Sequence, residues 1–321
     1  MKIKRITNVV IAAFMLFISG CNCCKSEKTQ LKVATYNIQM APKPTDIYWQ
    51  TRKDAAKDLL AYYKFDIWGS QETFLHQIQY VLPEGYDFVG VGRDDGKTQG
   101  EYSPVCYNKN KLQLLDSGTF WISETPEKVS KGWDAMCRRV CSWGQFKDKK
   151  TGKIFFFFNT HLDHRGEKAR IEGVKLLMKK VKEISKGQTY FLTGDFNITP
   201  EHKALKPMFA SKDFIHVRDV CTTKPYGPDA TYHAYTGIPF AFIDYIFASP
   251  NVKVLDYRVV TDRIGERAYE YKENANNNAS NLDSAPSGMN LKKLSTKKIL
   301  KKQTDVDYAS DHCPVVSTVE F

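Results

Sequence analysis

Six short polar clusters interrupt the apolar runs of this sequence, at points where the strands of an α/β fold would end. Together they supply carboxylates, carboxamides and two imidazoles. Carboxylate and carboxamide oxygens suit a hard cation such as Mg²⁺, and histidines beside carboxylates suit acid–base work or the stabilisation of developing charge. In chain order the clusters are Tyr36-Asn37, Gln71-Glu72, Thr160-His161-Leu162, Gly194-Asp195-Phe196-Asn197, Ile243-Asp244-Tyr245 and Ser310-Asp311-His312.

The chemistry that these groups could perform together is the hydrolysis of a phosphate ester. That reaction needs a cation on the phosphoryl oxygens, an activated water and donors for the charge of the transition state. A single cluster predicts little, because an Asp-His pair such as Asp311-His312 is more often a capped turn, and Glu72 alone is typical of a helix N-terminus. The combination in this order is the specific signal.

The residues around the clusters predict a mixture of strands and helices. Apolar spacing typical of helices marks Trp49–Tyr63, Phe74–Leu82 and Arg165–Ser185. We expect the first two strands after residue 240 to pair with each other, the last strand to lie at a sheet edge, and helices to cover the sheets in a layered α/β fold. The predicted strands are Leu31–Ile38, Phe65–Gly69, Tyr86–Val91, Ser103–Asn108, Leu112–Trp121, Val140–Lys147, Ile154–Thr160, Thr189–Thr193, Ala241–Ala248, Val252–Val260 and Cys313–Phe321.

The ordered set of clusters resembles the endonuclease/exonuclease/phosphatase superfamily, the deoxyribonuclease-I-like fold, over roughly Lys32 to Phe321. The resemblance implies a four-layered α/β/β/α sandwich of two packed mixed sheets flanked by helices, with the site at one rim of the sheets. Three further stretches look like a bacterial branch near the deadenylase-type members, namely Gly90–Gly96, Gly100–Pro104 and Asp163–Glu167.

The resemblance also implies a metal site. Glu72 is implied as the main metal carboxylate, with Asn37 and Asp311 nearby, for Mg²⁺ or for Mn²⁺ as a substitute. Some nuclease branches carry an acidic residue two positions after the first Asn, where this sequence has Gln39. The absence of that acidic group favours a site for one metal ion over a site for two.

The same resemblance implies catalytic roles for the remaining residues. Asp195 and Asn197 would position the attacking water and the scissile phosphate. His312 would act as the general base or stabilise the transition state, held by Asp244 through its other ring nitrogen, and His161 would donate to the phosphate or the leaving oxygen. Which group takes the proton of the water stays open at the level of the sequence.

Two arginines are candidates for contacts with the substrate phosphate. Arg165 stands four residues after His161, in a loop that opens a helix, and Arg138 lies on or beside a strand. A guanidinium can bind a phosphate through two hydrogen bonds, but a structural ion pair is an equal alternative for either residue. Trp121 and Trp133 could stack on a base, although aromatic residues this frequent more often belong to a core.

The sequence leaves the phosphorylated substrate open between a nucleic acid, a nucleotide, a lipid headgroup and a sugar phosphate. Phosphodiester cleavage, by a nuclease or a sphingomyelinase-like phospholipase, and removal of phosphate from a monoester are equal interpretations. The competing class is a surface lipoprotein that uses the fold for binding without catalysis. The sequence carries no nucleic-acid recognition module, no GxSxG motif and no signal of an obligate protein partner.

The N-terminal residues are typical of a lipoprotein signal peptide. Basic residues precede the short apolar run Val9–Ile18, and Ile18-Ser19-Gly20-Cys21 resembles a bacterial lipobox, in which Cys21 would be lipidated. We therefore expect a signal peptide over residues 1–20, a lipidated tether over 21–30 and one domain over 31–321. The mature chain would be an exported lipoprotein of the bacterial cell envelope, anchored to a membrane; a plain signal peptide or an inserted helix is the alternative.

One change of composition interrupts the predicted domain. Residues from about 265 to 307 lose the hydrophobic pattern and become rich in Asn, Ser and Lys, which predicts a long mobile insertion between the last two strands. Within it, Leu291–Lys302 is either a basic helix that touches phosphate or anionic lipid, or a solvated charged loop. Because these lysines contribute to the formal net charge of +11, the overall charge says little about the substrate.

Overall fold

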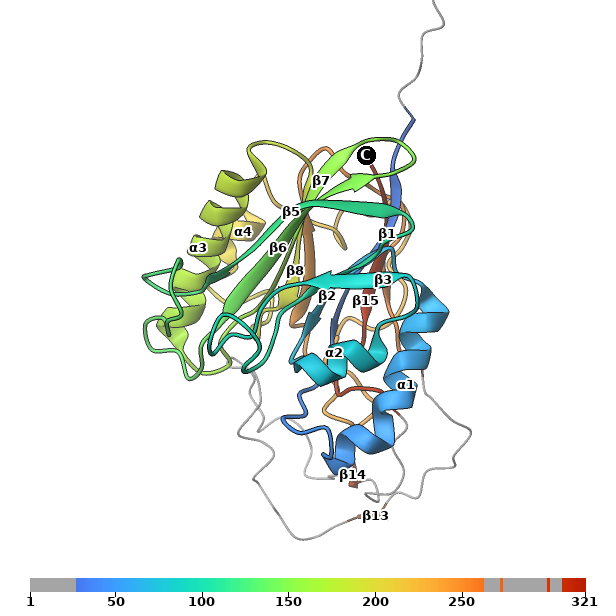
Figure 1. Cartoon of the computed structure of the whole chain (residues 1–321), viewed down its shortest axis with the longest axis vertical. Coiled ribbons are helices and arrows are strands. Elements are labelled where there is room, and N and C mark those ends of the chain that lie inside the picture. The colour runs from blue at the N-terminus through green and yellow to red at the C-terminus, as the bar shows by residue number, and fades with distance from the viewer. Residues whose placement is uncertain (1–26, 263–271, 274–298, 301–307) are drawn as a thin grey trace, which may run out of the picture.

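The computed structural model describes residues 27–262, 272–273, 299–300 and 308–321. Its strands form two large sheets that pack face to face, and helices cover the outer face of each sheet (Figure 1). Helices α1 (Ile47–Tyr63) and α2 (Leu75–Val81) lie on one side, and α3 (Glu167–Ser185) and α4 (Lys206–Phe209) lie on the other. The predicted four-layered α/β/β/α sandwich is confirmed.

The first sheet has seven strands in the order β11-β15-β1-β2-β4-β3, with β12 also paired to β15. Among these strands β1 and β2 run parallel, and the other neighbours run antiparallel. The bounds are β1 Gln30–Asn37, β2 Ile67–Gln71, β3 Tyr86–Val89, β4 Val105–Asn108, β11 Lys253–Val254, β12 Arg258–Val259 and β15 Val315–Glu320.

The second sheet has six strands in the order β5-β6-β7-β8-β10-β9, and its one parallel pair is β7 with β8. A separate antiparallel pair joins β13 to β14. The bounds are β5 Leu112–Trp121, β6 Val140–Asp148, β7 Ile154–His161, β8 Tyr190–Asp195, β9 Ile215–His216, β10 Asp244–Ala248, β13 Lys272–Glu273 and β14 Ile299–Leu300.

Local sequence explains where the two long helices begin and end. Asp46 caps α1, because its carboxylate accepts a hydrogen bond from the backbone N–H of Trp49, and Lys64 ends the helix in the left-handed conformation. In α3, Val174 and Val181 recur at helical spacing and are buried in the same core cluster as the second sheet. The apolar face of each long helix therefore fixes the sheet that the helix covers.

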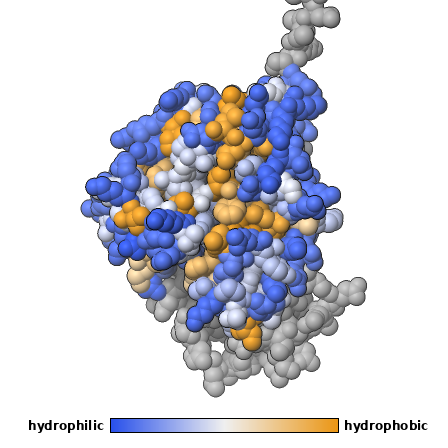
Figure 2. All heavy atoms as spheres, viewed as in Figure 1, coloured by the Kyte–Doolittle hydropathy of each residue, from blue (hydrophilic) through white to orange (hydrophobic). Residues whose placement is uncertain are grey.

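The main core fills the space between the two sheets. In β7 the side chains alternate, so Phe155, Phe157 and Asn159 point to one face and Phe156 and Phe158 to the other. The first face meets the first sheet and the second face meets α3, and for this reason the strand is apolar on both sides. At the surface, hydrophobic residues form a band down the middle of the viewed face, with polar residues around it (Figure 2).

Two predictions about the strands are wrong. The last strand, β15, lies inside the first sheet rather than at its edge, because β11 and β12 pair with the side of β15 that β1 leaves free. The stretches Ala241–Ala248 and Val252–Val260 do not pair, since β10 joins the second sheet while β11 and β12 join the first. The short elements α4 and β9 were not predicted.

Parts of the N-terminal and insertion predictions lie outside the described residues. These are the signal peptide over 1–20, the lipidated Cys21, most of the tether over 21–30 and, apart from the β13–β14 pair, most of the insertion over about 265–307. Among the described residues, no helix combines the length and the apolar character needed to cross a membrane.

The sheet topology brings the polar clusters to one rim. The parallel strands β1 and β2 end at Asn37 and Gln71, which are register partners, and β7 and β8 end at the partners His161 and Asp195. β10 and β15 run antiparallel to β8 and β1, so their first residues lie where the parallel strands end. Residues from six strands or strand ends therefore converge on the same edge of the sandwich.

The two-faced burial of β7 makes a stability prediction. Replacing Phe157, which is 0% exposed, by alanine would leave a cavity between the sheets and lower the free energy of unfolding by about 3–5 kcal/mol. The matched control is Ile154→Ala on the same strand. Ile154 is 39% exposed, so we expect this replacement to lower the free energy of unfolding by less than about 1 kcal/mol. Urea unfolding followed by fluorescence measures both values, and equal losses would contradict the described burial.

Candidate active site

Asp195, at the end of β8, is the centre of the rim cluster. One carboxylate oxygen, Oδ2, accepts a hydrogen bond from Asn37 Nδ2 at 3.0 Å, and lies 3.5 Å from His161 Nε2 and 3.8 Å from His312 Nε2. The other oxygen accepts from the backbone N–H of Asn197 at 2.8 Å. Burial, and after it the nearby charge of the Asp244 carboxylate, raise the pKa of Asp195 to about 7.

His312 and Asp244 form a buried ion pair beside this carboxylate. His312 Nδ1 lies 2.9 Å from Asp244 Oδ2, which also accepts a 2.5 Å hydrogen bond from the Thr231 hydroxyl. Burial opposes a charge on the imidazole, but the carboxylates of Asp244, Asp195 and Asp311 outweigh it and raise the pKa of His312 to about 10. At neutral pH His312 is therefore an imidazolium, with Nδ1–H on Asp244 and Nε2–H directed toward Asp195.

His161, at the end of β7, is held in the opposite protonation state. Asn197 Nδ2 donates to the Leu162 carbonyl at 3.0 Å, which fixes the orientation of the amide and makes His161 Nε2, 2.9 Å away, an acceptor. Burial, followed by the charges of Arg139 and Arg93, lowers the pKa of His161 well below its usual value. The ring is therefore neutral, and its single proton sits on Nδ1.

Glu101 lies on the protonated side of this ring. Its Oε2 is 3.9 Å from His161 Nδ1 and 2.8 Å from Arg93 Nη1, and the Glu101 residue is 7% exposed. Burial raises the pKa of Glu101, while the charge of Arg93 acts in the opposite direction. The structure therefore adds Glu101 to the site as the acidic neighbour of His161.

Glu72 follows β2 and reaches the cluster from the first sheet. Its Oε1 accepts from Asn37 Nδ2 at 3.2 Å, and its Oε2 accepts from the backbone N–H of Met40 at 3.0 Å. Asn37 Oδ1 accepts from the backbone N–H of Gln39 at 2.9 Å. The Asn37 amide thus turns its NH₂ group toward the carboxylates of Glu72 and Asp195 and holds both in place.

Asp311 joins the rim through Gln39. Gln39 Nε2 donates to Asp311 Oδ2 at 3.3 Å, and the Ser310 hydroxyl donates to the Asn37 carbonyl at 2.6 Å. Burial raises the pKa of Asp311, and the negative charge of Glu72 adds to the effect. Gln39, which the sequence marks as a departure from some nuclease branches, therefore connects two of the predicted metal ligands.

Three rim residues adopt backbone conformations that non-glycine residues rarely take. The φ angles are +56° at Gln39, +53° at Glu72 and +54° at Asn197, all in the left-handed region. Each of them directly follows a strand or lies two residues beyond one. Such conformations persist where the surrounding structure enforces them, which is characteristic of functional sites.

The donor set of the rim fits a divalent cation. Glu72, His161 and Asp195 each offer a ligand atom, and these atoms lie within 4.8 Å of one another; the same holds for Asp195, Asp244 and His312. Because His312 is protonated at both nitrogens, the second group lacks one of its ligands. In the first group His161 Nε2 already accepts from Asn197, which leaves the carboxylate oxygens of Glu72 and Asp195 as ligands, and such oxygen ligands favour a cation on the Glu72 side.

A buried polar network between the sheets was not foreseen from the sequence. Asn159 of β7 accepts from Gln71 Nε2 at 2.6 Å and donates to the carbonyls of Ser70 and Pro104 at 2.7 and 2.9 Å. Gly69 allows this contact, because a Cβ there would lie 2.1 Å from Asn159 Oδ1. The network fixes the two parallel strand pairs against each other one step below the rim, where no short motif signals it.

The two candidate phosphate-binding arginines lie in the loops beside the cluster. Arg138 is partly exposed and forms a 3.3 Å ion pair with Asp94. Arg165 is exposed, and its backbone N–H donates to Asp163 Oδ1 at 3.0 Å. A contact of either guanidinium with a substrate phosphate stays a prediction. Trp121 is 7% exposed and donates to the Arg93 carbonyl, as expected for a core residue.

The sequence model of the Endonuclease/Exonuclease/phosphatase family matches residues 34–312. The chain belongs to this family. The matched segment begins in β1 and ends at His312, so it contains every rim residue described above. The resemblance inferred from the ordered clusters is confirmed.

Two solved structures from one organism share about a third of the sequence. A family protein of Bacteroides thetaiotaomicron is 34% identical, with a TM-score of 0.75, and the match covers 92% of this chain and 99% of that chain. A mannosyl-6-phosphatase of Bacteroides thetaiotaomicron VPI-5482 is also 34% identical, with a TM-score of 0.74, and the match covers 91% of this chain and 100% of that chain.

More distant similarities concern the fold alone or part of the chain. The catalytic domain of human Nocturnin with a bound sulfate anion is 17% identical, with a TM-score of 0.59 and coverage of 91% and 96%, which shows a common fold. An uncharacterized protein of Acanthamoeba polyphaga mimivirus is 29% identical over 160 residues. That match spans 46% of this chain and 59% of the viral protein.

The His312–Asp244 pair makes a prediction about protonation. Asp244→Asn removes the carboxylate that most strongly raises the pKa of His312, so the imidazolium of the variant should lose its proton at a lower pH than in the natural protein, where the pKa is about 10. Nuclear magnetic resonance of labelled histidine measures the shift. Asp219→Asn is the control, because it removes the partner of another buried histidine, His216. An unchanged pKa in Asp244→Asn would contradict the pairing.

Proposed function

We propose that this chain is a metal-dependent hydrolase that releases phosphate from a phosphate monoester, with sugar phosphates as the substrate class. The observation that carries the proposal is the convergence of Glu72, Asp195 and His312 on one rim, with a neutral and a protonated imidazole on either side of one carboxylate. The mannosyl-6-phosphatase, at 34% identity over its whole length, supports the monoester and the sugar.

Glu72 would hold the cation, with Asp311 and Asn37 beside it, and Mg²⁺ is the ion that such oxygen ligands suit, with Mn²⁺ as a substitute. A bound divalent cation would draw negative charge from the phosphoryl oxygens and lower the pKa of a water molecule. The NH₂ group of Asn37 donates to both Glu72 and Asp195. Asn37 would therefore hold these two carboxylates at a fixed separation.

Asp195 is the group that fits proton transfer from water. Its pKa of about 7 lets it alternate between carboxylate and carboxylic acid near neutral pH. His312, with a pKa of about 10, already carries its proton and is suited to stabilise negative charge on the phosphoryl group rather than to accept a proton. Of the two roles that the family resemblance implies for His312, the charges of the site therefore support the second.

His161 and Asn197 act on the geometry of this centre. The side-chain amide of Asn197 donates to His161 Nε2. The backbone N–H of Asn197 donates to Asp195 Oδ1. Because the proton of neutral His161 is on Nδ1, the ring presents an acceptor toward Asn197 and Asp195. Donation from His161 to the phosphate or the leaving oxygen stays a prediction.

The role of Glu72 predicts a change in metal dependence. Glu72→Gln keeps the size of the side chain but removes its charge, so the Mg²⁺ concentration for half-maximal phosphate release should rise by at least about tenfold. Phosphate release from a hexose 6-phosphate by the full-length protein, titrated with Mg²⁺ after treatment with EDTA, measures it. Glu84→Gln, at an exposed position, is the control. An unchanged Mg²⁺ titration in Glu72→Gln would remove Glu72 as the metal ligand.

The leader supports a proposal about location, namely an exported lipoprotein anchored in the bacterial cell envelope through Cys21. If the lipobox is read correctly, Cys21→Ser should abolish lipid attachment and move the protein from the detergent phase to the aqueous phase in a Triton X-114 partition. Cys23→Ser, two residues further on, is the matched control and should stay in the detergent phase. Detergent partition by Cys21→Ser equal to that of the natural chain would exclude this anchor.

A further inference from the structure

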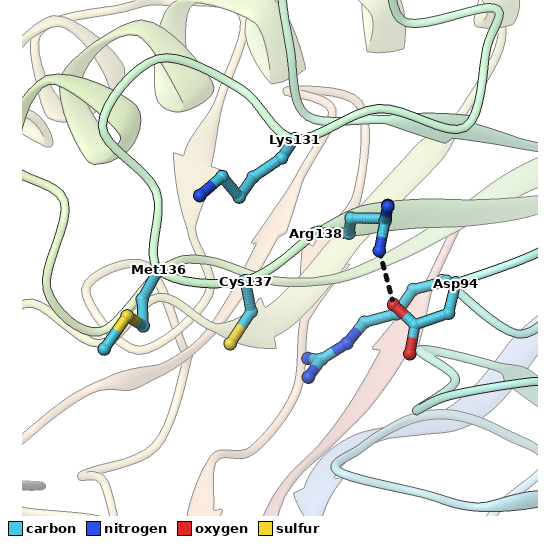
Figure 3. Close-up of a pocket in the computed structure, with 6 residues that line it drawn as sticks. Asp94, Lys131, Met136, Cys137 and Arg138 are labelled. Atoms are coloured by element: carbon cyan, nitrogen blue, oxygen red, sulfur yellow. Dashed lines mark hydrogen bonds and ion pairs between the residues drawn. The ribbon is translucent and has the colours of Figure 1, made fainter.

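A pocket of about 460 Å³ lies beside the candidate active site and is lined by charged and sulfur-containing side chains. Figure 3 shows that the side chains of Lys131, Met136, Cys137 and Arg138 come from one segment of the chain and that Asp94 comes from the segment facing it. Arg93 completes the lining. The volume is within the range of small-molecule sites in proteins.

The pocket opens next to the reacting groups. Arg93 lines it, and the guanidinium of Arg93 is 2.8 Å from Glu101 Oε2, which lies 3.9 Å from His161 Nδ1. The Glu101 side chain therefore lies between the pocket wall and His161. A group attached to a phosphate at the rim would extend toward this space.

The walls are held by buried hydrogen bonds. Asp163, which is 2% exposed, accepts from the backbone N–H groups of Met136 and Cys137 at 3.0 and 3.2 Å, and these bonds tie the wall to the loop that follows His161. On the opposite side, the indole N–H of Trp121 donates to the Arg93 carbonyl at 2.9 Å. The pocket is thus part of the framework of the site and not a gap between loose loops.

The charges of the pocket are mostly neutralised in pairs. Arg93 pairs with Glu101, and Arg138 pairs with Asp94 at 3.3 Å. Lys131 adds one positive charge to the lining of the pocket. Two guanidiniums that already contact carboxylates are poorly suited to hold a second phosphate group, and none of the six lining residues has an aromatic ring on which a nucleobase could stack.

We propose that this pocket binds the hydroxyl-bearing ring of the substrate, with Asp94 and Arg138 as the residues that select a sugar phosphate over other phosphate esters. The proposal rests on the phosphatase activity proposed above. A sugar hydroxyl both donates and accepts hydrogen bonds, and the Asp94–Arg138 pair presents an acceptor and donors side by side without a net charge. Met136 and Cys137 supply apolar surface for the C–H face of the ring.

The test compares a substrate that has hydroxyls with one that lacks them. The full-length protein and the variants Asp94→Asn and Arg138→Gln would be assayed with mannose 6-phosphate and with p-nitrophenyl phosphate, in Mg²⁺. Loss of a hydrogen-bond partner of a substrate hydroxyl lowers selectivity, so the ratio of kcat/KM for the sugar to kcat/KM for the aryl ester should fall by about tenfold in each variant. Arg258→Gln, another partly exposed arginine paired with an aspartate, is the matched control and should keep the ratio.

Each outcome decides between the two proposals. Equal losses on both substrates would mean that Arg138 contacts the phosphate that they share, and would overturn the sugar assignment, as would an unchanged ratio. Turnover of p-nitrophenyl phosphate without turnover of mannose 6-phosphate or of other hexose 6-phosphates would overturn it while leaving the phosphatase intact. No turnover of any of these esters by the natural protein would contradict the proposed function itself. Two variants on opposite walls keep the test valid if one of them fails to fold, which thermal unfolding would reveal.

Discussion

The crowding of carboxylates at one rim of the sandwich is the constraint on which the site depends. Asp195, Asp244, Glu72 and Asp311 lie close together there, and besides burial the charge of Asp244 raises the pKa of Asp195 and the charge of Glu72 raises the pKa of Asp311. The chain offsets part of this repulsion with one imidazolium, on His312, and with the amide N–H groups of Asn37 and Asn197. A divalent cation beside Glu72 would offset much of the remaining repulsion between the carboxylates. The crowding of negative charge that destabilises the rim therefore also suits it to bind a cation.

The two sheets make this crowding possible because each contributes a parallel pair of strands that ends at the same level. Asn159 and Gln71 then join the sheets by a hydrogen bond next to the rim, which holds Glu72, directly after β2, beside Asp195 and His161 of the second sheet. Strained backbone at Glu72 and Asn197 turns the side chains inward instead of letting the chain continue outward. Because β7 is packed on both faces, the strand that carries His161 is held firmly in place.

Much of the fold and of the rim could be predicted from the sequence, for a physical reason. Asn37, Glu72, His161 and Asp195 each follow an apolar run, and strands of an α/β fold end at a common edge, while the packing of the two sheets at one rim was implied by the family resemblance. The position of β15 inside its sheet, the separation of β10 from β11 and the contact of Asn159 with Gln71 depend on pairing between distant segments, and local patterns carry no trace of it. The protonation states of His161 and His312 likewise follow from neighbours that only the fold brings together.

If the rim is a cation site, Glu72 is its main ligand, and a bound ion must lie against this carboxylate. Diffraction from crystals of the protein grown with Mn²⁺, with data collected at a wavelength where manganese scatters anomalously, tests it most directly. We expect one strong anomalous peak in contact with the Glu72 carboxylate and on the Asp195 side of the rim. A peak elsewhere with none at Glu72, or no peak at a Mn²⁺ concentration that supports full phosphate release, would contradict it.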